Sequence, residues 1–418
     1  MASSLLKSCV RSSATVLGRG TVPRLARLHS LASNPLPATF LRGGTSKGIF
    51  INRDALPEDR VHWDTIFLGI MGSPDPEYGR QLNGMGGGVS SLSKICVVEK
   101  PTKEQSDKGI DVVYTFVQVG IRDTSIDYSG NCGNLSSMIG AFAIDEGIGR
   151  PRPERLDAHK GIATLRSLNT NTNKIVDTTF PVVAAFDSVT PILDLQQATV
   201  AGVPGKASRI ILDFVSPGGA RTGKLLPTGN PVDHIAVDIS GNSTQFRVSL
   251  VDATNPTVFI TSEDLRSALG LSPDAVIDFH DDQVRGIMED IRQKGAILMG
   301  LDPSAQAQPK IAALSPPRPE DTDSDIVVQA FSMGVLHKAV PMTVGLCLGV
   351  ASGVKGTLAN DIVQRIRQER REEPDDLITM RHAGGTVDVG SQFDAQGNVL
   401  SARVVRTGRR LMKGVVWW

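Results

Sequence analysis

The chain has 418 residues, of which 40% are hydrophobic and 21% are charged, the composition of a globular protein long enough for two domains. Lysine plus arginine equals aspartate plus glutamate at 44 each, so no basic surface for nucleic acid is expected, and aromatic residues, at 5%, are too few for base stacking. No stretch approaches the length of a membrane span, so we expect no membrane insertion.

The four cysteines are too far apart in sequence to suggest a shared structural site. They lie at Cys9, Cys96, Cys132 and Cys347 and form no Cys-x-x-Cys pair, which argues against a disulfide framework and a structural zinc site. No group of histidine, aspartate and glutamate has metal-ligand spacing. We therefore expect a reducing compartment and no metal.

The amino terminus differs in composition from the rest of the chain. Residues 1–53 contain no aspartate or glutamate, while basic residues alternate with Ser, Ala, Leu and Val. This is typical of a mitochondrial presequence, and the alternative is a disordered basic tail on a cytoplasmic protein. We assign residues 1–35 to this segment and divide the remainder into halves at 36–190 and 191–418.

The first half is predicted to be rich in strands, with one buried helix. Strands are expected at 38–41, 49–51, 95–98, 112–119, 163–167 and 174–176, and a helix is expected at 63–69. The long loop 73–88 is rich in turn-forming residues, and such loops are usually functional or mobile. Lys94 follows this loop at the start of a strand. It is either a solvated strand-end lysine or a general base whose pKa is lowered by partial burial.

A second polar segment, Asp-Tyr-Ser-Gly-Asn-Cys-Gly-Asn at 127–134, precedes an apolar run at 135–144 that predicts a buried helix. Cys132 is thereby placed at a helix N-terminus, where free N–H groups and the helix dipole favour a thiolate or a substrate carboxylate. The alternative is a small buried cysteine in a turn. Further polar groups in the segment favour the anion site, namely Ser129, Asn131 and Asn134.

The second half repeats this order loosely. Strands are expected at 210–215 and 246–251, and a capped helix begins at 262. A strand at 326–331, a polar turn and an apolar helix at 342–352 then follow the order of the first half, and 381–387 resembles the turn at 42–46. This suggests two similar α/β halves facing each other across a cleft, unless the echo is coincidental.

Other candidate residues carry weaker signals. The segment 218–225 nearly fits a phosphate-binding P-loop, but Leu225 replaces the magnesium-binding hydroxyl and Pro227 prevents the helix that would follow. A substrate-side or hinge loop is preferred, in which Arg221 and Lys224 could bind a carboxylate. We expect Cys96 and Cys347 in the core. His337 and His382 could reach the cleft or could be structural histidines.

Four blocks of sequence, in order, resemble the PrpF family of methylaconitate isomerases. They are Arg-Gly-Gly-Thr-Ser-Lys-Gly at 42–48, Ser-Pro-Asp-Pro at 73–76 with Gly-Met-Gly-Gly-Gly-Val-Ser-Ser-Leu-Ser-Lys at 84–94, the Cys132 segment, and Pro-Thr-Gly-Asn at 227–230. The resemblance implies an α/β (α+β) fold of two pseudo-symmetric, diaminopimelate epimerase-like halves. Each half would be a mostly antiparallel sheet wrapped around a central helix, with the active site between them and no cofactor.

The family's members shift or flip double bonds in small unsaturated di- and tricarboxylates. By motif, the resemblance places the catalytic lysine at Lys94 and the active-site cysteine at Cys132, and it places carboxylate-binding turns at Thr45, Ser46, Asn131, Gly133 and Asn134. The late family motif His-Pro-Ser-Gly reads His-Ala-Gly-Gly here, at His382 to Gly385, so one serine contact to the substrate is absent.

The expected function is therefore isomerisation of an aconitate-type tricarboxylate, such as 2-methylaconitate or cis- or trans-aconitate, through a dienolate. Lys94 is favoured as the principal base, and Cys132 is either a second acid/base or part of the pocket wall. The natural setting would be propionate breakdown through methylcitrate. Two alternatives stay open: an aconitate isomerase for itaconate-type metabolism, and a non-catalytic accessory protein of an iron–sulfur dehydratase. A homodimer is possible.

Overall fold

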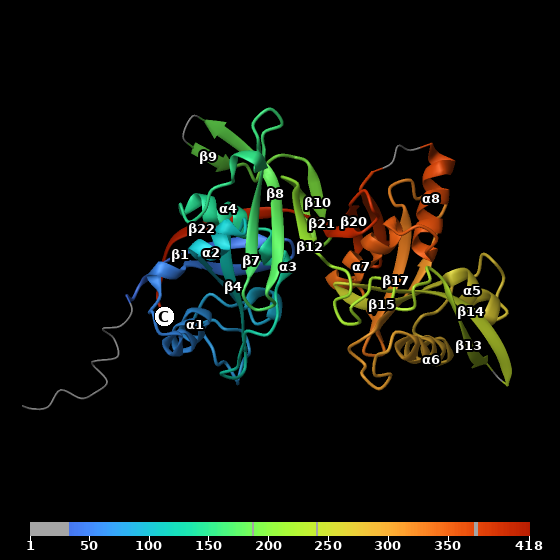
Figure 1. Cartoon of the computed structure of the whole chain (residues 1–418). Coiled ribbons are helices and arrows are strands. Elements are labelled where there is room, and N and C mark those ends of the chain that lie inside the picture. Colours follow the sequence, from blue (N-terminus) through green and yellow to red (C-terminus); the bar gives the residue numbers. More distant parts are fainter. Residues whose placement is uncertain (1–32, 186–187, 240, 372–374) are drawn as a thin grey trace, which may run out of the picture.

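The computed structural model describes residues 33–185, 188–239, 241–371 and 375–418. The expected presequence lies almost wholly outside these residues. The described chain forms two halves that lie side by side, the first from blue to green and the second from yellow to red in Figure 1. In both halves most of the regular structure is β-strand, with a few helices.

The first half begins with two hairpin strands and contains the shorter helices. Its elements are β1 (Leu36–Gly43), β2 (Ser46–Asn52), α1 (Trp63–Met71), β3 (Lys94–Glu99), α2 (Lys103–Asp107), β4 (Val112–Val119), β5 (Ile126–Asp127), α3 (Gly133–Ser136), α4 (Ile139–Asp145), β6 (Leu156–Asp157), β7 (Ile162–Asn169) and β8 (Lys174–Ala185). A connection containing β9 (Ser188–Pro191), β10 (Ala198–Val200) and β11 (Val203–Ala207) leads to the second half. The strands and the helix α1 confirm the sequence prediction.

The second half contains the longer helices. Its elements are β12 (Ile210–Val215), β13 (Asp233–Ile239), β14 (Asn242–Ala253), β15 (Asn255–Thr261), α5 (Ser262–Ala268), α6 (Asp282–Leu298), β16 (Lys310–Ser315), β17 (Ile326–Ser332), β18 (Val335–Leu336), α7 (Met342–Gly353), α8 (Leu358–Arg370), β19 (Leu377–His382), β20 (Gly385–Phe393) and β21 (Val399–Arg406). The last strand is β22 (Gly408–Val416).

The two halves have the same strand order and the same pattern of strand directions. In the first, β1 pairs with β2 antiparallel, β2 with β3 parallel, β3 with β4 antiparallel, β4 with β7 parallel and β7 with β8 antiparallel. In the second, β14, β15, β16, β17, β19 and β20 repeat these five pairings in the same order. The predicted duplication is thus present. The expected fold class, two similar halves with mostly antiparallel sheets, is confirmed.

Two strand pairings join the halves. β12 pairs with β8 of the first half and with β21 of the second, so the sheets are continuous through this pair. After β21 the chain returns to the first half, where β22 pairs with β1 along its length. Figure 1 shows this red strand crossing to the blue half. The division at 36–190 and 191–418 therefore does not describe the C-terminus, because the last strand completes the first sheet.

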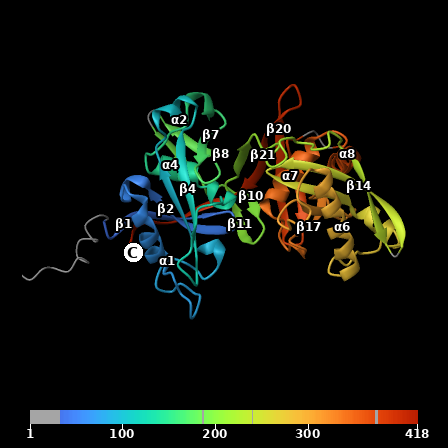
Figure 2. The ribbon, with the colours of Figure 1, turned by 60° about the horizontal axis from the view of Figure 1, so that its bottom comes forward.

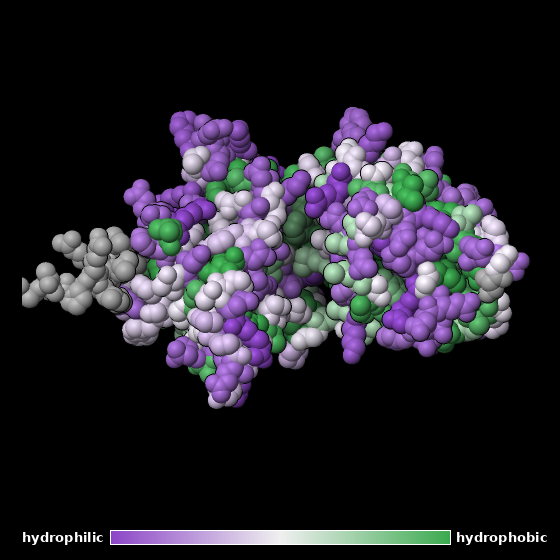
Figure 3. Space-filling view, turned by 90° about the horizontal axis from the view of Figure 1, so that it is seen from below, coloured by the Kyte–Doolittle hydropathy of each residue, from purple (hydrophilic) through white to green (hydrophobic). Residues whose placement is uncertain are grey.

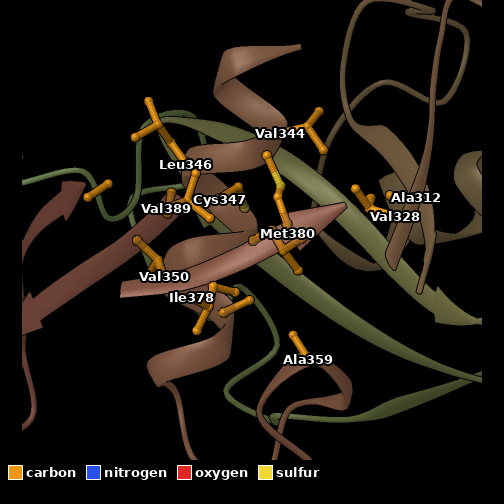
Figure 4. Close-up of a cluster of buried hydrophobic side chains, with 14 of the residues drawn as sticks. Ala312, Val328, Val344, Leu346, Cys347, Val350, Ala359, Ile378, Met380 and Val389 are labelled. Atoms are coloured by element: carbon orange, nitrogen blue, oxygen red, sulfur yellow. The ribbon is translucent and has the colours of Figure 1, made fainter. Parts of the chain in front are cut away.

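Each sheet packs against one central helical segment. In the second half this is α7, which Figure 4 shows among buried side chains that include Val344, Cys347 and Met380. In the first half, α3 and α4 occupy the equivalent place, with Leu135 and Phe142 buried against Cys96. Cys96 and Cys347 are core residues, as predicted.

The helix predicted at 135–144 is two short helices instead of one. The Ser137 hydroxyl donates a hydrogen bond to the Asn134 carbonyl at 2.7 Å, and the Met138 N–H bonds to the Leu135 carbonyl three residues back. A serine side chain that takes a backbone carbonyl in this way interrupts the regular helix ladder. The dipole that acts on Cys132 is consequently that of a very short helix.

One predicted correspondence between the halves is wrong. The turn at 381–387 resembles the turn at 42–46 in sequence, but it joins β19 to β20, which correspond to β7 and β8. The structural counterpart of the β1–β2 turn is the β14–β15 turn at Thr254. Both turns require positive φ, at Gly44 and at Thr254.

Candidate active site

The N-termini of the two central helices meet between the halves. Cys132 is the N-cap of α3, as predicted, and Pro341 is the N-cap of α7. Gly133 lies so close to Met342 that an added Cβ would be 2.2 Å from the Met342 sulfur. The N-terminus of α3 thus contacts Met342 at the N-terminus of α7, so the free N–H groups of the two helices lie at one junction. Figure 2 shows the two halves side by side, with β10, β11 and α7 near their junction, and Figure 3 shows the surface hollowed between the halves.

Lys94 is held on the side of the first sheet that faces this region. Cys96 and Val98, which alternate with Lys94 along β3, pack against α3 and α4, whereas Ile95 and Val97 pack against α1. Lys94 is only 9% exposed, and its ammonium lies 4.9 Å from the centre of the Phe116 ring. It donates a hydrogen bond to Gln118 Oε1. Within the described residues it forms no ion pair.

The loop that precedes Lys94 is held by hydrogen bonds rather than being open. Buried Gln81 donates to Ser93 Oγ at 2.7 Å, and Ser93 Oγ donates to the Val119 carbonyl. The Asp75 carboxylate accepts bonds from the N–H groups of Arg80, Gln81 and Tyr78, which lower its pKa to about 2. The loop thus positions the backbone from which Lys94 projects.

Cys132 and its neighbours add a thiol and three hydroxyl groups to the site. The Cys132 thiol lies 3.8 Å from Ser46 Oγ, so β2 and the N-terminus of α3 meet at this pair. Asn131 Oδ1 accepts a bond from Ser136 Oγ, which also contacts the Tyr114 hydroxyl at 2.9 Å. Burial raises the pKa of Tyr114, which therefore remains protonated at neutral pH.

A cavity of about 650 Å³ lies beside this cluster, between the two halves and the β10–β11 hairpin. Thr45, Asn134, His382 and Arg406 are among its lining residues. Asn134 joins the two halves, because its Nδ2 donates to Thr45 Oγ1 at 3.0 Å and its Oδ1 accepts from Arg406 Nε at 3.0 Å. Lys206 and Arg209 add further positive charge to the lining, which suits an anionic ligand.

The charge states of Arg406 and His382 follow from burial. Burial lowers the pKa of Arg406 to about 10, partly offset by the nearby Cys132 thiol, so the guanidinium remains charged at neutral pH. Burial also lowers the pKa of His382, which is therefore neutral there. His382 Nδ1 accepts a bond from the Gly384 N–H at 3.0 Å.

The structure brings most predicted site residues together and leaves others apart. Cys132 and Ser46 lie together at the N-terminus of α3, Lys94 lies on the face of β3 that packs against α3 and α4, and Thr45, Asn134 and His382 line the cavity. Gly385 packs against Ala201 at the cavity edge, where an added Cβ would lie 2.8 Å from the Ala201 Cβ. Three predicted residues are exposed and do not line this cavity, namely Ser129, Arg221 and Lys224.

The resemblance to a P-loop at 218–225 has a structural explanation. The Arg221 and Thr222 N–H groups both donate to Asp252 Oδ2, at 2.8 and 2.7 Å. The backbone groups that would otherwise bind phosphate are therefore occupied by a buried carboxylate, and no helix follows the loop.

Two important residues escape the sequence reasoning. Arg406 reaches the cavity because β21 pairs with β12, and no local motif marks it. Gln118 lies opposite Lys94 in the β3–β4 register, so a pairing of those two predicted strands would have identified it.

In the part of the chain that is described, no group of three or more His, Cys, Asp or Glu side chains could hold a metal ion.

Comparison with known proteins identifies the family of this chain. The sequence model of the family described as PrpF protein matches residues 34–418. The chain belongs to the PrpF family. A 3-methylitaconate isomerase of Eubacterium barkeri is 33% identical over 91% of this chain and 97% of its own length. A 2-methyl-aconitate isomerase of Shewanella oneidensis is also 33% identical, over 91% and 96%.

A solved structure supports this assignment. A methylitaconate-delta-isomerase crystal structure shares 30% sequence identity with the chain and superposes with a TM-score of 0.75, covering 92% of this chain and 96% of the other. This PrpF-family chain is accordingly an isomerase, of the methylaconitate and methylitaconate type.

Proposed function

We propose that this isomerase acts on an aconitate-type unsaturated tricarboxylate, without a cofactor, by moving a proton through a dienolate. The observation that carries the proposal is Lys94, which is buried, forms no ion pair within the described residues, and lies on the face of β3 that packs against α3 and α4. A buried lysine without a carboxylate partner is unusual unless it serves chemistry or an incoming anion. The 2-methyl-aconitate isomerase among the relatives supports the substrate class.

In the proposed reaction, the Lys94 amine removes a proton from a carbon next to a substrate carboxylate. The electron pair of the broken C–H bond is delocalised into that carboxylate and the adjacent double bond, which forms the dienolate. Lys94 then returns the proton, either to the allylic carbon or to the original carbon after rotation. Asn134, Thr45 and Arg406 hold the carboxylates, and their donors stabilise the developing negative charge.

Cys132 has two possible roles in this scheme. Its thiol could return the proton from the side opposite Lys94, or it could only shape the pocket. A Cys132→Ala variant distinguishes them. Loss of turnover with retained solvent exchange of the substrate proton would assign Cys132 as the second acid. Small changes in both rates would leave it as part of the pocket wall.

Proton NMR in deuterated buffer tests the proposal, using the full chain with cis-aconitate and, separately, 2-methylaconitate. Isomerisation with incorporation of solvent deuterium, lost in Lys94→Ala, is the expected result and identifies the preferred substrate. If a folded protein neither converts either substrate nor exchanges its proton, the proposal fails, and a role as accessory to an iron–sulfur dehydratase becomes the better explanation.

Import into mitochondria is a separate proposal, which microscopy of the chain fused to a fluorescent protein would test.

A further inference from the structure

A second lysine occupies the position of Lys94 in the other half. Lys94 is the first residue of β3, and Lys310 is the first residue of β16, its counterpart. In the parallel pairings, Ile49 lies beside Ile95 and Val258 lies beside Ile311, so the register is also the same. Lys94 lies opposite Gln118 and bonds to it, and Lys310 likewise bonds to Ser332, through Nζ and Oγ at 2.9 Å.

Lys310 faces the central helix of its half. Ala312 and Leu314, which alternate with Lys310 along β16, belong to the core around α7. Ile311 and Ala313 face the opposite way, into the core beside α6. The hydrogen-bond partner of Lys310, Ser332, ends β17, and the chain then runs through β18 and His337 to the N-terminus of α7. This is the helix end that meets Gly133.

The surroundings of Lys310 contain no counter-ion. Lys310 is half-buried, and within the described residues it forms no ion pair. His337 interacts electrostatically with Lys310, and burial together with that positive charge lowers the pKa of His337, so it is neutral at pH 7. Burial also lowers the pKa of Lys310 itself. A half-buried ammonium with only a hydroxyl partner is incompletely compensated, and an incoming carboxylate would supply the missing charge.

We propose that Lys310, with Ser332 and His337, forms a second carboxylate subsite through which the C-terminal half holds a polycarboxylate whose reacting carbon faces Lys94. This inference rests on the proposed function for the identity of the ligand. The substrate would then span the two helix N-termini, with one end held by each half. A tricarboxylate would use this subsite for the carboxylate farthest from the reacting carbon.

The surroundings of the two lysines differ, and those of Lys310 favour carboxylate binding over proton transfer. Lys94 lies near the Cys96 thiol and over the Phe116 ring. The equivalent residues of β16 and β17 are Ala312 and Ala330, and Pro341 takes the helix N-cap position of Cys132, so no thiol stands at these positions. The neighbour of Lys310 is instead His337, which is neutral at pH 7 and can donate a hydrogen bond to a carboxylate.

Isothermal titration of the full-length protein with tricarballylate, a saturated tricarboxylate that cannot isomerise, tests the subsite directly. We expect Lys310→Met to weaken binding about tenfold or more, because a charge-assisted hydrogen bond is lost. Exposed Lys355 provides the matched control, and Lys355→Met should bind as the wild type does. Equal affinity of Lys310→Met and the wild type would overturn the proposal, and so would failure of the wild type to bind.

Two further measurements keep the test decisive. If Lys310→Met does not fold, Ser332→Ala removes the hydroxyl alone and should still weaken tricarballylate binding, and unchanged affinity would contradict the subsite. In turnover assays, Lys310→Met should raise KM at least tenfold with kcat changed less than threefold. The protein could bind tricarballylate in a manner that depends on Lys310 and yet isomerise no substrate. That result would support the subsite and refute only the proposed reaction.

Discussion

The two halves share one scaffold but differ at the residues nearest the junction. Their strand orders and directions are the same, and the equivalent strands β3 and β16 both begin with a lysine. At the start of the central helix, however, the first half has Cys132 and Gly133, and the second has Pro341 and Met342. At this position the first half thus has a thiol and a glycine, whereas the second has an apolar pair.

This difference has a chemical meaning. A reaction that acts on one end of an asymmetric substrate needs acid/base groups on one side and anchoring groups on the other. The two halves also differ in the connection that follows their last paired strand. Between β8 and β12 this connection contains β10 and β11, which line the cavity, and Gly202 there lies near Thr45. Between β20 and β21 the connection is only the short turn at 394–398. The two halves therefore share their sheet topology but differ in the residues and connections near the cavity.

The sharpest comparison exchanges each lysine for methionine. Lys94→Met should reduce kcat by about a thousandfold, because general acid/base catalysis is lost. Lys310→Met should mainly raise KM. Steady-state kinetics on both variants and on Lys355→Met, with circular dichroism as the folding control, measures this difference. Equal losses of kcat in the two lysine variants would show that both halves take part in proton transfer.

Arg406 tests whether the cavity between the halves binds the substrate. Arg406→Met should weaken tricarballylate binding about tenfold to a hundredfold, since a charged donor is lost. The unliganded protein should lose only about 1 kcal/mol of stability, because the guanidinium donates a hydrogen bond to Asn134 but forms no ion pair within the described residues. Urea unfolding with and without tricarballylate would measure both effects. A large loss of stability without ligand would mean that Arg406 is structural.

The β1–β2 turn and its counterpart differ in how closely they approach their helix. At Gly43 an added Cβ would lie 2.2 Å from the Asn134 carbonyl oxygen, whereas the equivalent residue in the second half is already Ala253. Gly43→Ala should therefore destabilise the protein by about 2 kcal/mol through overpacking. The reverse change, Ala253→Gly, should cost about 1 kcal/mol. Urea denaturation compares them, and equal effects would contradict the asymmetry.

The smallest expected effect concerns the loop that supports Lys94. Because backbone donors lower the pKa of Asp75 from its ordinary value of 3.8 to about 2, its carboxylate stabilises the folded state above pH 3.8. This contribution is lost as the pH falls toward 2. Asp75→Asn should thus be less stable than the wild type at pH 7, and the two should converge in acid. Urea denaturation at several pH values tests this, and a constant difference would exclude the carboxylate as the cause.

Local sequence was sufficient for the elements and for the residues near them in the chain. Alternating or continuous apolar runs predicted β4, β12 and α7 closely, because these segments bury their side chains in a regular pattern. The glycine-rich blocks marked the backbone around Lys94 and Cys132. The break in the helix at Ser137 was missed, because one hydroxyl–carbonyl bond within an apolar run leaves no periodic signal.

Only the tertiary structure decided which segments form the site. Arg406 lies 272 residues from Asn134 in the chain, and the pairing of β21 with β12 brings them together. The equivalence of Lys310 with Lys94 likewise depends on strand order and register, since a shared Lys-Ile pair at the start of an apolar run is too short a match to reveal it. Arg221 and Lys224 look suitable in sequence but are exposed and do not line the cavity, and their loop is bonded to Asp252 instead. Apolar periodicity records which face of a segment is buried, but it does not record which distant segment covers that face.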